Sequence, residues 1–465
     1  MKEQLDLQTH LKPAFASLAK ELATNVSRHG GQLYLVGGTV RDLLLSCTPS
    51  ELDIEVHGLT SDELTKCLEQ NYKLNHVGKS FGVIKLKGLP VEIALPRIEV
   101  KSGAGHKGFI IEVEPNLSFK KAAYRRDFTI NAMGLDPITG KLEDPYGGQK
   151  DLECKILRNV SPAFKEDPLR VLRGMQFASR FHLIATEETI NMCQAMDLEG
   201  LANERIFDEW KKLLLRGKSI SHGLNFLKQT KWLSFFPELM NLVNCQQDPE
   251  WHPEGDVWTH TLHCMDAFAK KRIGDSWEDL IVGFAILCHD FGKPLTTVID
   301  TDGRIRSPKH ESAGEGPTQS FLERLTNQKE IIEQVVPLVK RHLAPRTFFI
   351  DQAGDSAIRR LARQVLRIDR LVRVAEADIA GRPPRQDEFP EGKWLLERAE
   401  KLRVKATAPE PIIQGRHLIK KGCKPGPNFS PILKNCFDAQ LDGKFTEIEQ
   451  GLTYLEQLLN SKEEV

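Results

Sequence analysis

The chain has 465 residues, of which 64 are basic and 64 acidic, so its formal net charge is zero at pH 7. A chain of this length has room for roughly two to four domains with sizeable cores, and its balanced charge excludes nucleic-acid binding driven by overall charge. Its nine cysteines lack C-x-x-C spacing, which argues against a disulfide framework or a zinc finger and favours a reducing compartment.

The first informative region is a predicted strand–turn–helix–strand unit. Residues 33–36 have strand character and run into Gly37 and Gly38, a short helix containing Arg41 follows, and residues 51–56 predict a second strand. Two adjacent glycines let a backbone approach a ligand closely, and the start of a helix presents free N–H groups to an anion. Arg41 adds a cation one turn later. We therefore expect this turn to bind phosphate.

The second predicted strand carries three acidic side chains on one face. Side chains alternate along a strand, so Glu51, Asp53 and Glu55 point one way and the apolar residues between them point the other. Carboxylates beside a phosphate site repel one another and the ligand unless cations neutralise them, and a divalent metal is the usual solution. A solvated strand face after an ordinary glycine turn is the alternative.

The GGTVRD segment at 37–42 and the acidic strand after it resemble the head of the class II tRNA nucleotidyltransferase and poly(A) polymerase family. The resemblance implies catalytic, Mg²⁺-binding residues at Glu51 and Asp53, with a third carboxylate at Glu92. The family's first carboxylate is Asp, whereas this chain has Glu51, so Glu55 is an alternative partner for Asp53. Two Mg²⁺ ions would activate the tRNA 3′-hydroxyl and stabilise the leaving pyrophosphate.

Two further head motifs follow the predicted strands. Residues 97–108 form a basic, glycine-containing segment that we expect to be a mobile loop, and it matches the family's flexible loop. The RRDFTIN motif at 125–131 implies nucleotide contacts by this resemblance. Arg126 would bind triphosphate oxygens, Asp127 a ribose hydroxyl and Asn131 the 3′-hydroxyl. A surface ion pair explains Arg126 and Asp127 alone but not the seven-residue match.

The segment EDPLRVLR predicts the start of a helix, because Pro168 suits a first helical turn. Asp167, Arg170 and Arg173 then recur along one face. Asp167 alone is consistent with a helix cap. Cytosine and adenine each present an amino donor beside a ring-nitrogen acceptor, which a carboxylate and a guanidinium match. The resemblance implies that these residues select CTP and then ATP. Many members carry a third Arg where this chain has Gln176.

Later segments resemble other parts of the same proteins. Glu204 and Arg205 are similar to the family's neck helix, which braces the nucleotide site. The motifs WHPE (251–254), CHDFGK (288–293) and EADIAGR (376–382) resemble an HD-type phosphohydrolase domain, as in the family's multifunctional branch. Imidazole and carboxylate side chains are ligands for first-row metals. The implied HD metal ligands are His260, His289, Asp290 and Asp378.

Two matters in this HD segment stay open. His310 and His342 are candidates for phosphate contact or for a second metal. The mixture of imidazole and carboxylate ligands favours Ni²⁺, Co²⁺ or Mn²⁺ over Mg²⁺.

Downstream, arginines between 359 and 373 predict a basic amphipathic helix that tracks a tRNA backbone, with a solvated helix face as the alternative.

The expected fold class is α+β, with a mixed β-sheet in a nucleotidyltransferase head followed by all-α parts. The expected domains are a catalytic head (1–155), a helical neck with the nucleotide-selecting motif (156–245), an HD domain (246–400) and a helical tail that would contact tRNA (401–465). The polar start and the short apolar run at 281–288 predict a cytoplasmic protein without a membrane partner, and leave its oligomeric state open.

The predicted function is template-independent addition of CCA to tRNA 3′ ends from CTP and ATP, with a second, metal-dependent hydrolase activity in the HD domain. A poly(A) polymerase and an enzyme that adds only CC or only A share the head motifs. A third alternative is an HD phosphohydrolase whose transferase head has degenerated into an RNA-binding module. Glu51 favours that alternative, whereas the intact RRDFTIN and EDPLR motifs oppose it.

Overall fold

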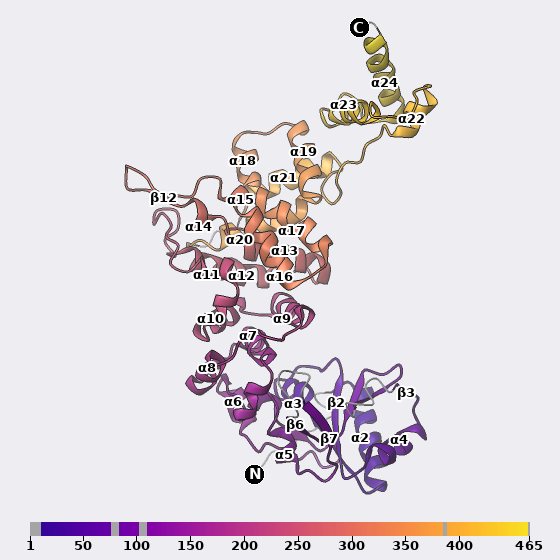
Figure 1. Ribbon diagram of the computed structural model, residues 1–465, viewed down its shortest axis with the longest axis vertical. Coiled ribbons are helices and arrows are strands. Elements are labelled where there is room, and N and C mark those ends of the chain that lie inside the picture. Colours follow the sequence, from indigo (N-terminus) through magenta and orange to yellow (C-terminus); the bar gives the residue numbers. More distant parts are fainter. Residues whose placement is uncertain (1–10, 76–82, 102–108, 385–387, 464–465) are drawn as a thin grey trace. The chain divides into compact units, whose positions relative to one another are not determined.

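The structure is a computed structural model that describes residues 11–75, 83–101, 109–384 and 388–463. It divides into two compact units, residues 1–235 and 236–465, which are described in turn (Figure 1). The head and most of the neck expected from the sequence lie in the first unit. The HD segment and the tail lie in the second.

The first unit begins with a mixed sheet. Its seven strands have the order β3-β4-β5-β2-β1-β8-β9, in which β2 and β5 are parallel and the other pairs are antiparallel. The α+β class with a mixed sheet is therefore confirmed. The main elements of this part are α2 (Pro13–Arg28), β1 (Gln32–Val36), α3 (Gly37–Leu44), β2 (Leu52–His57), α4 (Ser61–Glu69), β3 (Leu74–Asn75), β4 (Val83–Leu86), β5 (Val91–Ala94), β6 (Arg97–Lys101), β7 (Phe109–Val113), α5 (Phe119–Ala123), β8 (Gly134–Leu135) and β9 (Leu142–Glu143).

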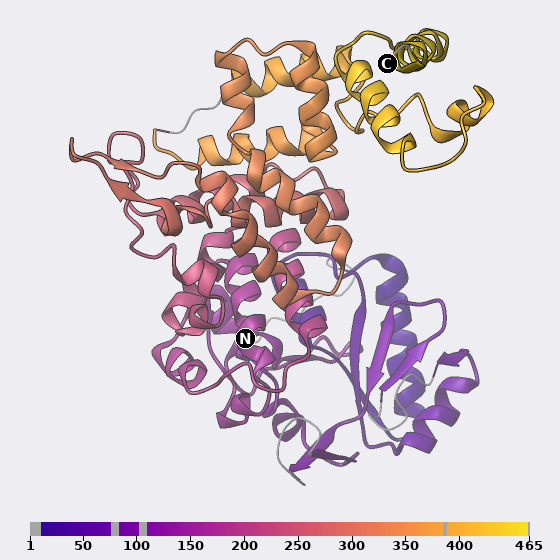
Figure 2. The same cartoon turned by 45° about the horizontal axis from the view of Figure 1, so that its top comes forward.

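Strand alternation separates the core of the head from its site. Leu35 and Ile54, which pair across β1 and β2, are buried in the core that the sheet shares with α2 and α4. Figure 2 shows these two helices, in indigo, beside the strands. Burying such a side chain stabilises the fold by roughly 1.5–3 kcal/mol. Tyr34, Asp53 and Glu55 lie on the opposite face, because neighbouring residues of a strand point to opposite sides. The sheet therefore keeps its carboxylates out of this core.

The rest of the first unit is mainly helical. Helix α7 packs against α9 and α10, and Gly174 shows how closely: a Cβ there would lie 2.8 Å from the ring of Phe226. These elements are α6 (Gly148–Glu153), β10 (Ile156–Leu157), η3 (Pro162–Glu166), α7 (Leu169–Phe181), β11 (Ile184–Ala185), α8 (Glu187–Gln194), α9 (Asn203–Arg216), α10 (Ile220–Gln229) and η4 (Trp232–Phe235).

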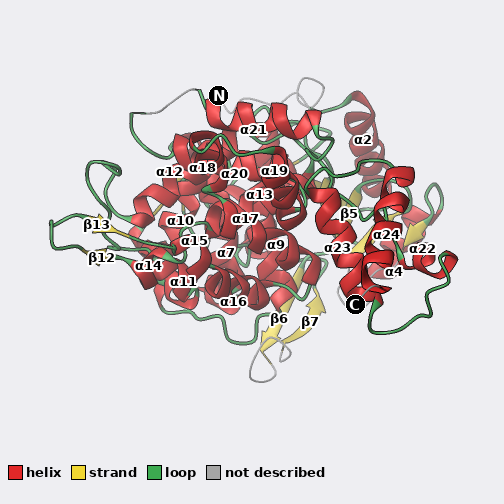
Figure 3. Ribbon diagram, turned by 90° about the horizontal axis from the view of Figure 1, so that it is seen from above, coloured by secondary structure: helices red, strands yellow, loops and turns green. Residues whose placement is uncertain are grey.

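The second unit is helical apart from the short ribbon β12–β13, as far as its described residues go (Figure 3). Helix α13 is buried from Glu278 to Cys288, as expected for a helix that is apolar on all sides, and it packs against α12, α17 and α20. The elements are α11 (Pro237–Met240), α12 (Val257–Lys270), α13 (Ser276–Cys288), α14 (Lys293–Thr296), β12 (Val298–Ile299), β13 (Ile305–Arg306), α15 (His310–Ala313), α16 (Glu315–Leu325), α17 (Lys329–Arg341), α18 (Ala344–Ile350), α19 (Asp355–Val365), α20 (Ile368–Ala380), α21 (Pro390–Lys401), α22 (Gly415–Lys420), α23 (Phe429–Leu441) and α24 (Ile448–Glu463).

Two details of the head differ from the sequence expectation. The segment expected as a mobile loop starts with strand β6, which pairs with β7, and residues 102–108 lie outside the described part. Strand β2 begins at Leu52, so Glu51 occupies the bend before the strand. In addition, no helix among the described residues is long and apolar enough to cross a membrane.

The prediction of a single basic helix between residues 359 and 373 is wrong. The segment forms two helices, α19 and α20, and several of its arginines bind acidic residues of α13. Arg370, which is only 5% exposed, donates to both carboxylate oxygens of Glu278 at 2.6 and 2.7 Å. Arg373 pairs with Asp279. A buried carboxylate requires a cationic or hydrogen-bonding partner, so these arginines are used inside the protein and do not track a tRNA backbone.

We expect Arg370→Met to lower the free energy of unfolding of the second unit by about 3–5 kcal/mol, because it leaves the buried Glu278 carboxylate without its bidentate partner. Thermal unfolding followed by circular dichroism measures the loss. Arg363→Ala is the matched control, since Arg363 is exposed on the neighbouring helix α19. Equal melting temperatures for wild type and Arg370→Met would refute a structural role for Arg370.

Candidate active sites

The glycine turn between β1 and α3 lies directly against Asp53. Gly37 has a φ of +61°, and a Cβ there would lie 3.4 Å from Asp53 Oδ2 and 3.3 Å from a guanidinium nitrogen of Arg126. A Cβ on Gly38 would lie 3.5 Å from the same carboxylate oxygen. The hydroxyl of Thr39 accepts a hydrogen bond from the Asp53 amide at 2.9 Å. The glycines therefore leave open the space beside Asp53.

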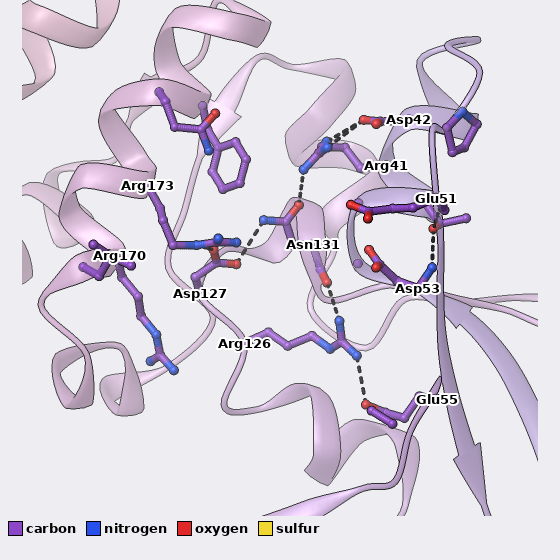
Figure 4. Close-up of a pocket in the computed structure, with 18 of the residues that line it drawn as sticks. Arg41, Asp42, Glu51, Asp53, Glu55, Arg126, Asp127, Asn131, Arg170 and Arg173 are labelled. Carbon is purple, nitrogen blue, oxygen red and sulfur yellow. Dashed lines mark hydrogen bonds and ion pairs between the residues drawn. The ribbon is translucent and has the colours of Figure 1, made fainter. Parts of the chain in front are cut away.

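Of the three carboxylates predicted as metal ligands, Glu51 and Asp53 line the cavity of the first unit, and Glu92 lies on the neighbouring strand β5. Asp53 pairs with Glu92 in the parallel register of β2 and β5, while Glu51 precedes β2 and is exposed. Figure 4 shows the Glu51 and Asp53 carboxylates pointing the same way. Burial and the charge of Glu51 raise the pKa of Asp53 to about 6, against the opposing charge of Arg126. Carboxylates that resist ionisation together are suited to a bound cation. Glu92 also forms an ion pair with Lys85.

Glu55 is held differently from Glu51. Its side chain is buried, with Oε2 accepting a hydrogen bond from Arg126 at 2.9 Å and Oε1 lying 3.0 Å from His57 Nε2. Burial alone would raise the pKa of Glu55, but Arg126 and His57 outweigh it and lower that pKa. Both oxygens therefore have protein partners. Of the two alternatives, the geometry favours Glu51 as the partner of Asp53.

A chain of hydrogen bonds joins the RRDFTIN motif to helices α3 and α7 (Figure 4). Arg173 Nε donates to Asp127 Oδ2 at 2.7 Å, and the Asn131 amide donates to Asp127 Oδ1 at 3.0 Å. Arg41 then donates to Asn131 Oδ1 at 2.7 Å and also binds Asp42. Burial would raise the pKa of Asp127, but Arg173 outweighs it and lowers that pKa. The network thereby fixes the positions of Arg41, Asn131 and Arg173.

The start of α7 positions the residues expected to select the base. Asp167 Oδ1 accepts from the Leu169 amide at 3.1 Å, so Asp167 does cap this end of the helix. Its Oδ2 accepts from Arg205 at 2.9 Å, which is the bracing expected of the neck. Arg170 donates to the carbonyl oxygens of Ala163 and Arg125 at 2.6 and 2.7 Å. The carboxylate and the guanidinium are therefore held rigidly by separate partners.

These parts enclose one cavity of about 610 Å³ in the first unit. Its lining combines the glycine turn and the carboxylates Glu51 and Asp53 with many cations. That composition suits a polyanion with several negative charges, such as a nucleoside triphosphate with its metal. The cationic lining residues are Arg41, Arg97, Arg125, Arg126, Arg170, Arg173, Arg180, Arg205, Lys212 and Arg216.

A second group of polar residues lies in the other unit. His260 on α12, His289 and Asp290 after α13, and Asp378 on α20 are each at most 5% exposed. His260 Nε2 lies 3.0 Å from Asp378 Oδ1 and 3.4 Å from His289 Nε2, and the latter lies 3.2 Å from Asp290 Oδ2. The four residues implied as HD ligands, which span more than a hundred positions, are therefore brought together.

His310 and His342 adjoin this cluster. Their Nε2 atoms are 3.4 Å apart, and His310 Nε2 lies 3.4 Å from Asp290 Oδ1. Burial and the neighbouring histidines lower the pKa of His342 to about 3, so its ring is neutral. With Asp290 and Asp378, both histidines line a cavity of about 240 Å³.

Sequence comparisons place this chain in a family. The family model described as the poly A polymerase head domain matches residues 33–158. A multifunctional CCA protein of Stenotrophomonas maltophilia is 36% identical over 379 residues, which cover 78% of this chain and 90% of that protein. This chain belongs to the multifunctional CCA protein family. A member from Acinetobacter baumannii (strain SDF) is 35% identical over 384 residues, covering 80% of this chain and 90% of its own length.

Solved structures agree with the family assignment at the level of the fold. The Bacillus stearothermophilus CCA-adding enzyme in complex with CTP has a TM-score of 0.66 and 21% identity, covering 97% of this chain and 99% of its own. The Thermotoga maritima CCA-adding enzyme complexed with tRNA has a TM-score of 0.58 and 22% identity, with 97% coverage of both chains. At these identities the likeness concerns the fold, and the family membership rests on the multifunctional CCA proteins.

Several residues of the two sites were missed in the sequence. Glu254, within the noted WHPE motif, accepts from Nδ1 of both His252 and His260. Cys264, one helical turn after His260, lies 3.3 Å from His260 Nε2, and its i+4 spacing was an available signal. In the first unit, Arg180 on α7 donates to Gln176 at 3.1 Å and lines the cavity. A guanidinium thus lies beside the position where many family members carry a third Arg.

Proposed function

We propose that this protein adds C, C and A to the 3′ end of tRNA from CTP and ATP without a nucleic-acid template. The observation that carries the proposal is the cavity of the first unit, where the glycine turn, Asp53, the RRDFTIN network and Asp167 with Arg170 line one space. Membership of the multifunctional CCA protein family supports it. We also propose that the enzyme is cytoplasmic.

The metal proposed for this site is Mg²⁺. Glu51, Asp53 and Glu92 offer carboxylate oxygens, the donors that Mg²⁺ prefers, and the raised pKa of Asp53 is consistent with carboxylates arranged for a cation. When bound, Mg²⁺ would favour the ionised form of the attacking hydroxyl and neutralise charge on the leaving pyrophosphate.

The protein's own residues would orient the reactants. Arg126 and the other cavity cations would bind the triphosphate, while Asp127 holds Arg173 and Asn131 in place. In the reaction the tRNA 3′-oxygen forms a bond to the α-phosphorus of the incoming nucleotide. The bond from that phosphorus to pyrophosphate breaks, and the hydroxyl proton is released. Fixed orientation of this kind contributes much of the rate in phosphoryl transfer.

Incubation with tRNA that lacks its 3′ CCA tests the proposal. With CTP, ATP and Mg²⁺ we expect addition of three nucleotides and then a stop. With CTP alone we expect the addition of two nucleotides, because the third addition requires ATP. No addition, or a long run of A, contradicts the proposal.

Base selection gives a sharper prediction. We expect the double variant Asp167→Ala, Arg170→Ala to increase incorporation of UTP and GTP by roughly tenfold or more, because a hydrogen-bonded pair that discriminates bases is worth about 1–3 kcal/mol. Single-turnover addition with each nucleotide measures it. Glu188→Ala, an exposed change on α8, is the control. Unchanged selectivity in the folded double variant would leave Asp167 and Arg170 with only structural roles.

We also propose that the second unit hydrolyses phosphates at RNA ends, such as a 2′,3′-cyclic phosphate. The convergence of His260, His289, Asp290 and Asp378 favours it, and this mixed donor set suits Ni²⁺, Co²⁺ or Mn²⁺. Water would add to phosphorus, the bond from phosphorus to the 3′-oxygen would break, and that oxygen would take the proton, which leaves a 2′-phosphate and a free 3′-hydroxyl. A cyclic 3′ end has no free hydroxyl, so its hydrolysis would precede nucleotide addition.

The cavity lining supports a nucleotide substrate for this second activity. Trp251 has 52% of its surface exposed, and the Arg346 guanidinium lies 5.9 Å from the centre of its ring. Both residues line the cavity that Asp290 and Asp378 also line. An exposed aromatic ring beside an arginine is a suitable surface for stacking a base at the end of an RNA strand.

A further inference from the structure

The guanidinium of Arg126 in the first unit is bound by two protein acceptors. Its Nη2 donates to Glu55 Oε2 at 2.9 Å, and its Nη1 donates to the carbonyl oxygen of Asn131 at 3.3 Å (Figure 4). Glu55 lies on strand β2, whereas Asn131 belongs to the same RRDFTIN motif as Arg126. The orientation of the guanidinium is therefore set by one carboxylate of the sheet and by the backbone of the motif.

A second carboxylate, that of Asp53, borders the same space. A Cβ on Gly37 would lie 3.3 Å from Arg126 Nη1 and 3.4 Å from Asp53 Oδ2, so these two groups face one point beside the glycine turn. Opposite charges this near attract each other strongly where burial reduces screening by water. An arginine that paired with Asp53 would neutralise the carboxylate that we propose as a Mg²⁺ ligand. Arg126 instead forms its ion pair with Glu55.

His57 holds Glu55 from its other side. The two residues share one face of β2, and His57 Nε2 lies 3.0 Å from Glu55 Oε1. The second ring nitrogen, Nδ1, donates to the carbonyl oxygen of Leu117 at 2.8 Å. The ring also meets Tyr34 edge-on, with the ring centres 5.5 Å apart, and both His57 and Glu55 are buried. One oxygen of Glu55 is thus held by His57 while the other binds Arg126.

We propose that Glu55 and His57 are positioning residues for nucleotide addition. The Glu55 carboxylate, fixed by the histidine, is the permanent partner of Arg126 and keeps its guanidinium away from Asp53. Asp53 is thereby left for the metal, and Arg126 can still bind a triphosphate in the cavity through the N–H groups that neither partner uses. The inference rests on the proposed transferase function and assigns a role to the one carboxylate of β2 that the proposed metal site does not use.

A crystal structure of the metal-free Glu55→Gln variant tests the proposal directly. Glutamine keeps the shape of the side chain and removes its charge. Because a hydrogen bond between two ions is stronger than one to a neutral amide, we expect the Arg126 guanidinium to move and bind the Asp53 carboxylate. The wild-type protein crystallised without metal is the control. If Arg126 keeps its contacts with residue 55 and Asn131 in the variant, the proposal is overturned, whether or not the protein adds nucleotides.

Binding of radiolabelled CTP at increasing Mg²⁺ concentration, without tRNA, gives a second measurement by equilibrium dialysis. We expect Glu55→Gln to need roughly tenfold more Mg²⁺ than wild type for half-maximal binding, as for loss of a hydrogen bond to a charged group. His57→Leu keeps Glu55 but removes its support, and should need roughly threefold more. His57→Gln, whose amide can still donate to Glu55, should match wild type. So should Glu188→Gln, an exposed change on α8.

The two histidine variants separate positioning from a direct role of Glu55. If Glu55 acted only as a negative charge or as a metal ligand, His57→Leu would bind CTP at the same Mg²⁺ concentration as His57→Gln, and that result would refute the positioning role. All variants should melt cooperatively, which excludes a general loss of structure. If the wild-type protein binds no CTP at any Mg²⁺ concentration, the proposed transferase function fails, and the position of Arg126 in the crystal decides the role of Glu55.

Discussion

Asp53→Ala is expected to abolish nucleotide addition while leaving hydrolysis by the second unit unchanged. Asp53 is the carboxylate against which the glycine turn packs, and burial and Glu51 raise its pKa to about 6. Removing a group placed to stabilise transition-state charge costs about 10²–10³-fold in rate. Incorporation of radiolabelled CTP into tRNA measures the loss.

Two variants complete this experiment. Asp62→Ala, on the exposed first turn of α4, removes a carboxylate of the same head without touching the site. It should add nucleotides at the wild-type rate. Asp53→Asn keeps the shape of the side chain and should be as inactive as Asp53→Ala, because the negative charge is what the proposed metal requires. If either Asp53 variant adds nucleotides at the wild-type rate, the head is not the transferase site that we propose.

His289→Ala is expected to have the opposite effect, with loss of cyclic-phosphate hydrolysis and normal CCA addition. His289 lies 3.4 Å from His260 Nε2 and 3.2 Å from Asp290, so it contributes to the centre of the proposed metal cluster. We expect the hydrolysis rate to fall by at least about 10²-fold, as for removal of a charge-stabilising group. Conversion of a 2′,3′-cyclic nucleotide to its 2′-phosphate, followed by ³¹P NMR, measures it.

Because His289 is buried, a shorter side chain also leaves a cavity. His289→Asn, which retains more of the volume, distinguishes a lost ligand from a disturbed fold, and both variants should melt cooperatively. Exposed His29→Ala is the control. A folded His289 variant that hydrolyses the cyclic phosphate at the wild-type rate would show that the cluster is structural.

Local patterns predicted much of what the structure contains. Alternation along residues 51–56 correctly separated Asp53 and Glu55 from the core, because side-chain direction in a strand depends only on position. The apolar run 281–288 lies in the buried helix α13, which ends at Cys288, directly before His289. In both cases the structure depends on neighbouring residues in the chain.

Pairings between distant residues were not predictable in this way. Glu55 and Arg126 are 71 positions apart, and their ion pair, with the His57 contact, is the reason that we propose Glu51 as the metal ligand in place of Glu55. Arg370 looked like part of a basic surface until its buried partner Glu278, 92 positions away, was known. An arginine pattern on a helix does not distinguish a phosphate-binding face from a set of internal ion pairs.

Addition to three tRNAs that end one, two or three nucleotides short of a complete CCA distinguishes CCA addition from its alternatives. Each is incubated with the protein, CTP, ATP and Mg²⁺, and product lengths are read on a sequencing gel. We expect all three to be extended to the same complete end and no further. Extension of only the longest tRNA, extension that always stops at CC, or a long A tail would contradict it.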